Sequence, residues 1–254
     1  MAKLAFYLML TSFIPLALVS ACINTTSLDD TALLGTSPFK RSNNTSQREL
    51  FNPFVDDEWD LDIKSRHVIE NPSLEQILRP GPLPEISLGQ PSAPVIIVQY
   101  TSMGCPYCRQ FHMETLPILK SEYINTGKVF YIFREFPIGY QSGAATIALR
   151  CVNPNQYFTL YDKLIRQQNS WVSRKVRHEP IFQIVKQVGI SRDEFDNCFS
   201  DKILINQLNQ IKKRGRTLGI IGTPNFFINE RLYKRRLTIR DIRELVHKAL
   251  ANVE

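Results

Sequence analysis

The sequence lacks the features that mark a polytopic membrane protein, a repeat protein or a disordered chain. After Val19 no segment is apolar enough to span a bilayer, and no internal repeat is evident. With 43% hydrophobic and 22% charged residues in a chain of 254, disorder throughout is excluded, and one sizeable core with an inserted lobe is expected. The net charge of +7 favours contact with anionic surfaces but indicates no chemistry.

Cysteine and histidine are also scarce, with five and four residues. The one close pair, Cys105 and Cys108, has no second C-x-x-C beside it and only His112 nearby, which disfavours a zinc site. Arg109 stands where haem attachment needs a histidine, so that function is excluded. Met103 gives the loop the M-x-C-x-x-C pattern of copper carriers, and copper binding stays an alternative because thiolates select the cuprous ion.

The single long apolar segment lies at the N-terminus. Lys3 precedes an apolar run over residues 4–19, and small residues then lead to Cys22. This pattern predicts an export signal over residues 1–21. Residues 19–22 also resemble a bacterial lipobox, in which Cys22 becomes the lipidated first residue of the mature protein. Ordinary cleavage and an uncleaved membrane anchor remain the alternatives.

Residues 22–79 are rich in Asn, Ser, Thr and Asp, with an acidic run at residues 56–62 and little periodicity. We predict a polar tether here, with one short helix at most. Trp59 docked on the folded domain is the alternative to a solvated linker. The folded part is expected to begin at Pro80.

Strand and helix patterns alternate after Pro80. The predicted strands cover residues 86–88, 95–100, 129–133, 222–229 and 231–234. A helix is predicted over residues 105–127, several more over 138–219 with breaks at residues 153–155, near Pro180 and at Gly189, and a closing one over 239–251. The strand, helix, strand order of the first half favours parallel pairing and an α/β class.

The sequence Cys105-Pro106-Tyr107-Cys108 lies where a predicted strand meets a predicted helix. Residues three apart in the first helical turn share a face, so the two cysteines can close a small disulfide ring. Pro106 suits the first helical position because its missing N–H costs nothing there. The helix N-terminus favours an anion, which lowers the pKa of Cys105 and predicts that it is the attacking thiolate. Cys108, deeper in the helix, is the predicted resolving thiol.

Two further cysteines, Cys151 and Cys198, lie on predicted helices. Thiols tend to pair in an oxidising compartment, and Cys22 leaves with the signal or its lipid. We therefore predict a structural disulfide between Cys151 and Cys198 that closes a loop of about 47 residues. Two buried apolar thiols are the alternative, and in neither case are these residues catalytic.

These motifs resemble the DsbA-like branch of the thioredoxin superfamily from about residue 74 to residue 251. The resemblance rests on residues 88–94, the redox loop that follows Tyr100, and the sequences at 111–112, 134–137, 144–145, 150–151 and 222–229. It implies a thioredoxin fold, in two parts at residues 80–137 and 219–254, with a helical domain inserted at 138–218.

The same resemblance implies that the Thr223-Pro224 peptide bond is cis and lies against the redox pair. Thr223 and Pro224 are therefore assigned to substrate binding, where the backbone can pair with an extended chain. From the sequence alone, Pro224 could equally start a strand. Members of the family often carry a buried carboxylate six residues before the first cysteine, and Gln99 stands at that position here. A proton relay through it is in doubt.

The leading functional hypothesis is a periplasmic dithiol oxidase that transfers its own disulfide to folding exported proteins with free cysteines. It needs no bound cofactor and is reoxidised by a membrane partner. A reductase or isomerase in the same compartment is the alternative, because the dipeptide Pro106-Tyr107 also occurs in glutaredoxin-type sites. Nucleic acid is not an expected partner, since the basic runs at residues 212–214 and 235–236 are better explained as solvated surface.

Overall fold

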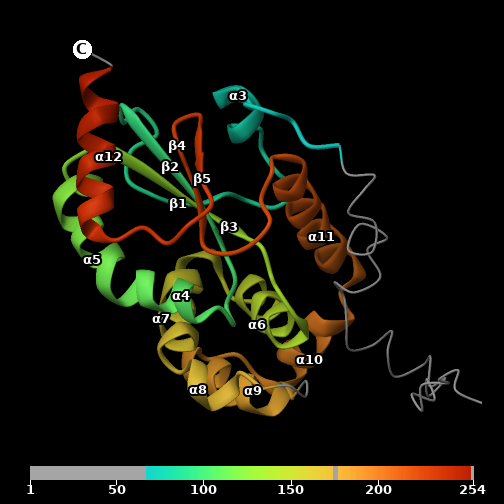
Figure 1. The fold of residues 1–254 in the computed structure, drawn as a ribbon. Coiled ribbons are helices and arrows are strands. Elements are labelled where there is room, and N and C mark those ends of the chain that lie inside the picture. Colours follow the sequence, from blue (N-terminus) through green and yellow to red (C-terminus); the bar gives the residue numbers. More distant parts are fainter. Residues whose placement is uncertain (1–66, 174–176, 253–254) are drawn as a thin grey trace, which may run out of the picture. The chain divides into compact units, whose positions relative to one another are not determined.

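The computed structural model describes residues 67–173 and 177–252, and its centre is a five-stranded sheet in the order β1-β3-β2-β4-β5 (Figure 1). The strands are β1 (Ile86–Leu88), β2 (Val95–Thr101), β3 (Val129–Glu135), β4 (Asn225–Ile228) and β5 (Arg231–Tyr233). Strand β2 pairs with β3 in parallel, and the other neighbours are antiparallel. The predicted strands and the α/β class are confirmed.

Strand β2 is covered on both faces, which explains its nearly continuous apolar sequence. Val95 and Ile97 point into the larger core, whereas Val98 and Tyr100 point into a second core on the opposite face. The period of two along a strand therefore places Gln99 on the side of the larger core.

Helices cover both faces of the sheet (Figure 1). A continuous helical segment follows β2, made of α4 (Pro106–Gln110), a π-helical stretch (Phe111–Thr115), α5 (Leu116–Leu119) and a second π-helical stretch (Lys120–Ile124). Pro117 lacks the N–H of a regular helical bond, which fits a departure from α-helical geometry around it. The closing helix α12 (Ile239–Ala251) contacts α5, β2 and β4.

A helical insertion separates β3 from β4, as predicted, and helices α6 to α10 gather at one end of the sheet (Figure 1). Its helices are α6 (Tyr140–Cys151), α7 (Tyr157–Arg166), α8 (Gln168–Trp171), α9 (His178–Val185), α10 (Arg192–Ser200) and α11 (Lys202–Thr217). Cys151 and Cys198 form a disulfide with an S–S distance of 2.01 Å, which joins α6 to α10.

The break predicted near Pro180 lies between α8, which ends at Trp171, and α9, which begins at His178. Pro180 itself is in the first turn of α9, where the missing N–H has no intrahelical partner to lose. The folded part begins before the expected Pro80, because helix α3 (Leu74–Leu78) places Ile77 fully buried in the second core. A Ser73 capping box starts this helix.

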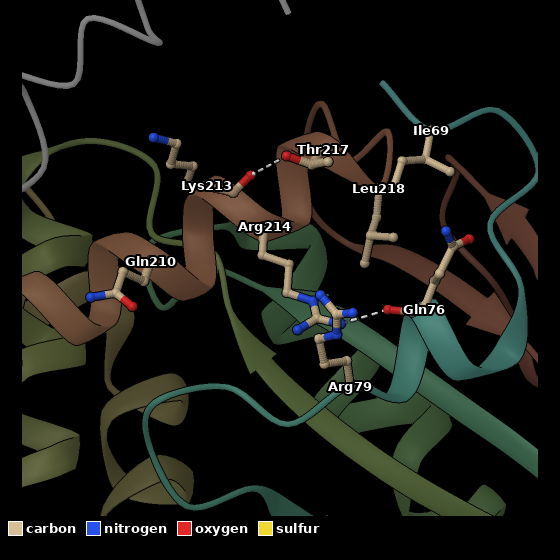
Figure 2. A pocket seen from close by; sticks show the side chains of 8 residues that line it. All are labelled: Ile69, Gln76, Arg79, Gln210, Lys213, Arg214, Thr217 and Leu218. Atoms are coloured by element: carbon tan, nitrogen blue, oxygen red, sulfur yellow. Dashed lines mark hydrogen bonds between the residues drawn. The ribbon is translucent and has the colours of Figure 1, made fainter. Parts of the chain in front are cut away.

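Helix α3 is held against α11 by specific bonds as well as by burial. The Arg214 guanidinium donates to the Gln76 carbonyl at 2.6 Å (Figure 2), and the backbone N–H of Ile69 donates to the carbonyl of Thr217 at 2.9 Å. Residues 69–79 are therefore part of the domain and not part of the predicted tether.

The export signal at residues 1–21, Cys22 and the tether as far as residue 66 lie outside the described residues. Within residues 67–173 and 177–252, no helix has the length and apolar character needed to cross a bilayer.

Candidate functional site

The two redox cysteines lie at the start of α4, directly after β2. Cys105 is the N-cap residue and Pro106 the first residue of the helix, as predicted. The loop closes with a backbone bond from Cys105 N–H to the Ser102 carbonyl at 3.0 Å. The Cys108 N–H then donates to the Cys105 sulfur at 3.4 Å, so the sulfur takes the acceptor role of an N-cap side chain. Cys108 itself is fully buried.

The loop before β4 reaches the same sulfur at the end of the sheet where β2 finishes, because β4 runs antiparallel beside β2 with Asn225 opposite Tyr100. The Thr223-Pro224 peptide bond is cis, which confirms the expectation. The Cys105 thiol donates to the Thr223 carbonyl at 3.3 Å, a contact between residues 118 positions apart. The Thr223 hydroxyl is buried without a hydrogen bond to any described residue, so it is free to turn toward a thiolate at Cys105. The structure therefore places Thr223, next to the cis proline, against Cys105 at the start of α4.

The surroundings tune the two sulfurs in opposite directions. The pKa of Cys105 is lowered to about 6, mainly by the facing Cys108 thiol, with help from the Thr223 side chain and the N–H groups of Cys108 and Tyr107, against partial burial. Burial raises the pKa of Cys108 well above its ordinary range, and the neighbouring Cys105 raises it further. Near neutral pH the reduced site thus holds one thiolate, on Cys105, and one thiol, on Cys108.

A neutral polar cluster from β2, β3 and α7 lies beside Cys108. Gln99 is buried, its side-chain oxygen accepts a bond from the Tyr131 hydroxyl at 2.6 Å, and its amide nitrogen has no partner among the described residues. The hydroxyls of Thr101 and Tyr161 lie 3.2 Å apart, also buried. An amide at position 99 cannot take up a proton as a carboxylate would. Gln99 therefore cannot relay a proton to the redox pair in the way a buried carboxylate would.

The helical insertion contributes two contacts to the redox loop that the sequence analysis missed. Ser142 of α6 shares a bond of 2.6 Å with the Ser102 hydroxyl and accepts from the Gly104 N–H at 3.2 Å. Gln168 of α8 donates to the carbonyls of Met103 and Cys105 at 2.6 and 3.0 Å. No sequence pattern marks these residues, because a single polar side chain on a helix is ordinary.

His112 lies packed on the helical segment that follows Cys108. Its Nε2 lies 2.9 Å from Asp162, its ring contacts that of Tyr161, and burial lowers its pKa. These contacts, with Asp162 and Tyr161, involve neither redox cysteine.

The surface next to Cys105 carries exposed apolar side chains. Tyr107 is 51% exposed, and Arg236 lies over its ring at 4.6 Å. The two residues line a groove of about 360 Å³ between α4 and the segment before α12. Ile221, just before the cis bond, is 71% exposed, and Ile138, whose N–H donates to Ser102, is 51% exposed.

The basic runs do not form one continuous exposed surface. Lys212 is buried, Arg214 donates to the Gln76 carbonyl of α3, and Arg235 pairs with Asp241 at 2.8 Å. The pocket of about 340 Å³ between α3 and α11 is lined partly by Arg79 and Arg214 and includes none of the redox residues (Figure 2). Across the described part of the chain, no group of three or more His, Cys, Asp or Glu side chains is placed to hold a metal ion.

Comparisons with known proteins agree with this geometry. A family model described as Thioredoxin matches residues 83–248. A Rickettsia bellii protein named as a protein-disulfide oxidoreductase is 33% identical over 172 residues, which make up 65% of this chain and 64% of that protein. A Bacillus anthracis protein named as disulfide bond formation protein D is 30% identical over 152 residues, 58% of this chain and 70% of that protein.

Among solved structures, Wolbachia pipientis α-DsbA1 aligns over 72% of this chain and 100% of its own, with a TM-score of 0.62 and 28% identity. The chain spans slightly less than two thirds of the length of the Rickettsia relatives that it matches. The expected thioredoxin fold with a helical insertion is thus confirmed, and the chain belongs to the thioredoxin family, in its DsbA-like branch.

Proposed function

We propose that this protein is an exported thiol-disulfide oxidoreductase that introduces disulfides into folding proteins through Cys105 and Cys108. The observation that carries the proposal is the pairing of an accessible sulfur of lowered pKa with a buried thiol of raised pKa at one helix N-terminus. Such a pair can form, release and re-form a disulfide without a bound cofactor.

In the first step a substrate thiolate attacks the Cys105 sulfur of the oxidised Cys105–Cys108 disulfide. The new bond joins the substrate sulfur to Cys105, and the broken bond releases the Cys108 sulfur with its electron pair, which then takes a proton. The attack is directed to Cys105 because its sulfur is partly exposed, whereas Cys108 is fully buried.

In the second step another substrate thiolate attacks the substrate sulfur of this mixed disulfide. The substrate disulfide forms, and Cys105 leaves as a thiolate. A leaving thiol of low pKa departs faster, so the contacts that lower the pKa of Cys105 to about 6 favour release in this direction. Two electrons have then passed from the substrate dithiol to the protein, which is left reduced.

The surface around Cys105 suits an unfolded or partly folded polypeptide. An extended substrate chain would lie along the Thr223-Pro224 loop, with main-chain bonds that do not depend on substrate sequence. The exposed apolar side chains of Tyr107, Ile138 and Ile221 offer contacts for the apolar residues that a folding protein still exposes.

The direction of exchange is the point to test, because a reductase or isomerase would use the same two cysteines. A pKa of about 6 lies between the values typical of thioredoxin, about 7, and of DsbA, about 3.5. Equilibration of the purified protein with glutathione redox buffers gives the reduction potential directly. A potential near or above that of protein disulfide isomerase supports the oxidase; one as low as that of thioredoxin refutes it in favour of the reductase.

Localisation and partners are part of the same proposal. The N-terminal pattern supports export to the periplasm with lipid attachment at Cys22, where a membrane protein would reoxidise the reduced pair. Metabolic labelling with a fatty acid tests the attachment. Label that persists in a Cys22→Ser variant would contradict it.

A further inference from the structure

The redox loop is held from the helical insertion by one buried glutamine. Gln168, at the first position of α8, has only 4% of its surface exposed. Its amide nitrogen donates to the Met103 carbonyl at 2.6 Å and to the Cys105 carbonyl at 3.0 Å. A side-chain amide has two N–H donors, so these two bonds use its full donor capacity.

These two carbonyls lie on either side of Gly104, where the chain turns from β2 into α4. The Cys105 carbonyl also accepts the Arg109 N–H at 3.1 Å, which is the first bond of the helix. The amide therefore binds the backbone just before the helix and the residue that caps it. Both contacts cross more than 60 positions of sequence, from the insertion to the thioredoxin part of the chain.

We propose that Gln168 is a positioning residue for thiol-disulfide exchange: it holds the backbone of Met103 and Cys105 so that the Cys105 sulfur stays at the N-terminus of α4, beside Thr223. This inference rests on the proposed exchange role of Cys105. It gives the helical insertion a part in the chemistry besides covering the core.

The physical effect of the amide is both geometric and electrostatic. Its N–H groups hold the loop in the conformation in which the Cys108 N–H reaches the Cys105 sulfur. They also balance the partial negative charge of two carbonyl oxygens close to the thiolate. Without them the carbonyls would turn to find other donors, and the thiolate would lose part of its stabilisation.

Gln141 of α6 provides a matched control in the same insertion. It is buried to a similar degree, with 6% exposed, and its amide nitrogen also donates to two backbone carbonyls, of Trp171 and Arg177, at 2.9 and 2.8 Å. Neither carbonyl belongs to the redox loop. Gln141→Met and Gln168→Met thus both remove two amide-to-carbonyl bonds at similar volume, and Gln141→Met also removes the bond that its oxygen accepts from the Arg177 N–H at 2.9 Å. Only Gln168 touches the loop before α4.

The experiment measures the rate of Cys105 alkylation by iodoacetamide against pH in the reduced full-length protein. Gln168→Met should lower the rate at pH 6 by about threefold to tenfold and move the midpoint of the profile upward. Gln141→Met should lower the unfolding midpoint in denaturant without moving the profile. A wild-type profile for Gln168→Met, or an equal shift for Gln141→Met, overturns the proposal.

If Gln168→Met does not fold, Gln168→Glu provides the second test. A carboxylate there would face two carbonyl oxygens, so the alkylation midpoint should again rise, and an unchanged midpoint refutes the role. Alkylation needs neither a protein substrate nor a direction of exchange. The glutathione equilibrium of the wild type tests the oxidase hypothesis, and the alkylation profile tests the role of Gln168. Either can therefore fail without the other.

Discussion

Replacing Cys108 with Ala removes the largest contribution to the low pKa of Cys105. The facing thiol donates toward the Cys105 sulfur, whereas the N–H groups of Cys108 and Tyr107 remain in the variant. A hydrogen bond to a charged group contributes about 1.5–3 kcal/mol, and one pKa unit corresponds to about 1.4 kcal/mol. Because the sulfur is partly exposed, we expect the low end of that range, a rise of about one unit.

The measurement is the pH dependence of Cys105 alkylation in reduced protein, followed by mass spectrometry. The wild-type midpoint should lie near 6 and that of Cys108→Ala near about 7. The N–H groups at the helix N-terminus keep the variant below the ordinary thiol value of about 8.5. An unchanged midpoint would show that the backbone alone sets the pKa, and the reasoning from the facing thiol would be wrong.

The same lowered pKa makes the stability of the reduced protein depend on pH. The folded value of about 6 lies below the unfolded value of about 8.5, so the stabilisation is complete above pH 8.5 and is lost as pH falls through 6. At pH 7 it amounts to about 1 kcal/mol after allowance for the partly exposed sulfur. The free energy of unfolding of the reduced protein, measured with denaturant, should fall by about 1 kcal/mol more between pH 7 and pH 5 in the wild type than in Cys105→Ser. Equal changes in the two proteins would contradict this prediction.

Three further substitutions test other parts of the structure. Cys108→Ser should accumulate mixed disulfides on nonreducing gels: the Cys105 thiolate attacks a disulfide of a substrate protein, and the variant lacks the Cys108 thiol that displaces the bound substrate sulfur in the wild type. Replacing Cys151 and Cys198 together with Ala should lower the free energy of unfolding by about 4 kcal/mol in the chain-entropy estimate, with thiol exchange largely intact. Arg150→Met should destabilise the fold by about 3–5 kcal/mol, because it leaves the buried Glu135 carboxylate without its ion pair at 2.5 Å.

Each of these three predictions has a result that would contradict it. Cys108→Ser without trapped complexes would mean that Cys108 does not resolve the intermediate. Free thiols at both Cys151 and Cys198 in a nonreduced digest of the exported protein would remove the structural disulfide. If Arg150→Met unfolds at the wild-type denaturant concentration, the carboxylate has found another partner or a proton.

Local signals in the sequence were sufficient to locate the redox pair. These signals are the strand before Cys105, the proline at the first helical position and the three-residue spacing of the cysteines. They involve only neighbouring residues, so their effect does not depend on distant parts of the chain. The apolar pattern of β2 and the capped closing helix α12 were predictable for the same reason. The resemblance to a known family was needed to anticipate the cis bond at Pro224.

The sequence alone therefore determined which residues we propose to carry the chemistry, and the tertiary structure decided how they are tuned. Two of the contacts that tune the site join segments far apart in the chain: Cys105 with the Thr223 carbonyl, and Gln168 with the redox loop. The burial that keeps Cys108 a thiol likewise depends on distant parts of the chain. Such contacts depend on how helices and strands pack, and a lone polar side chain on a helix has the same local pattern whether it faces solvent or a redox loop. The same reason explains why α3 was not assigned to the domain from the sequence. The residues before it are mostly polar, and only its packing against α11 shows that Ile77 is buried.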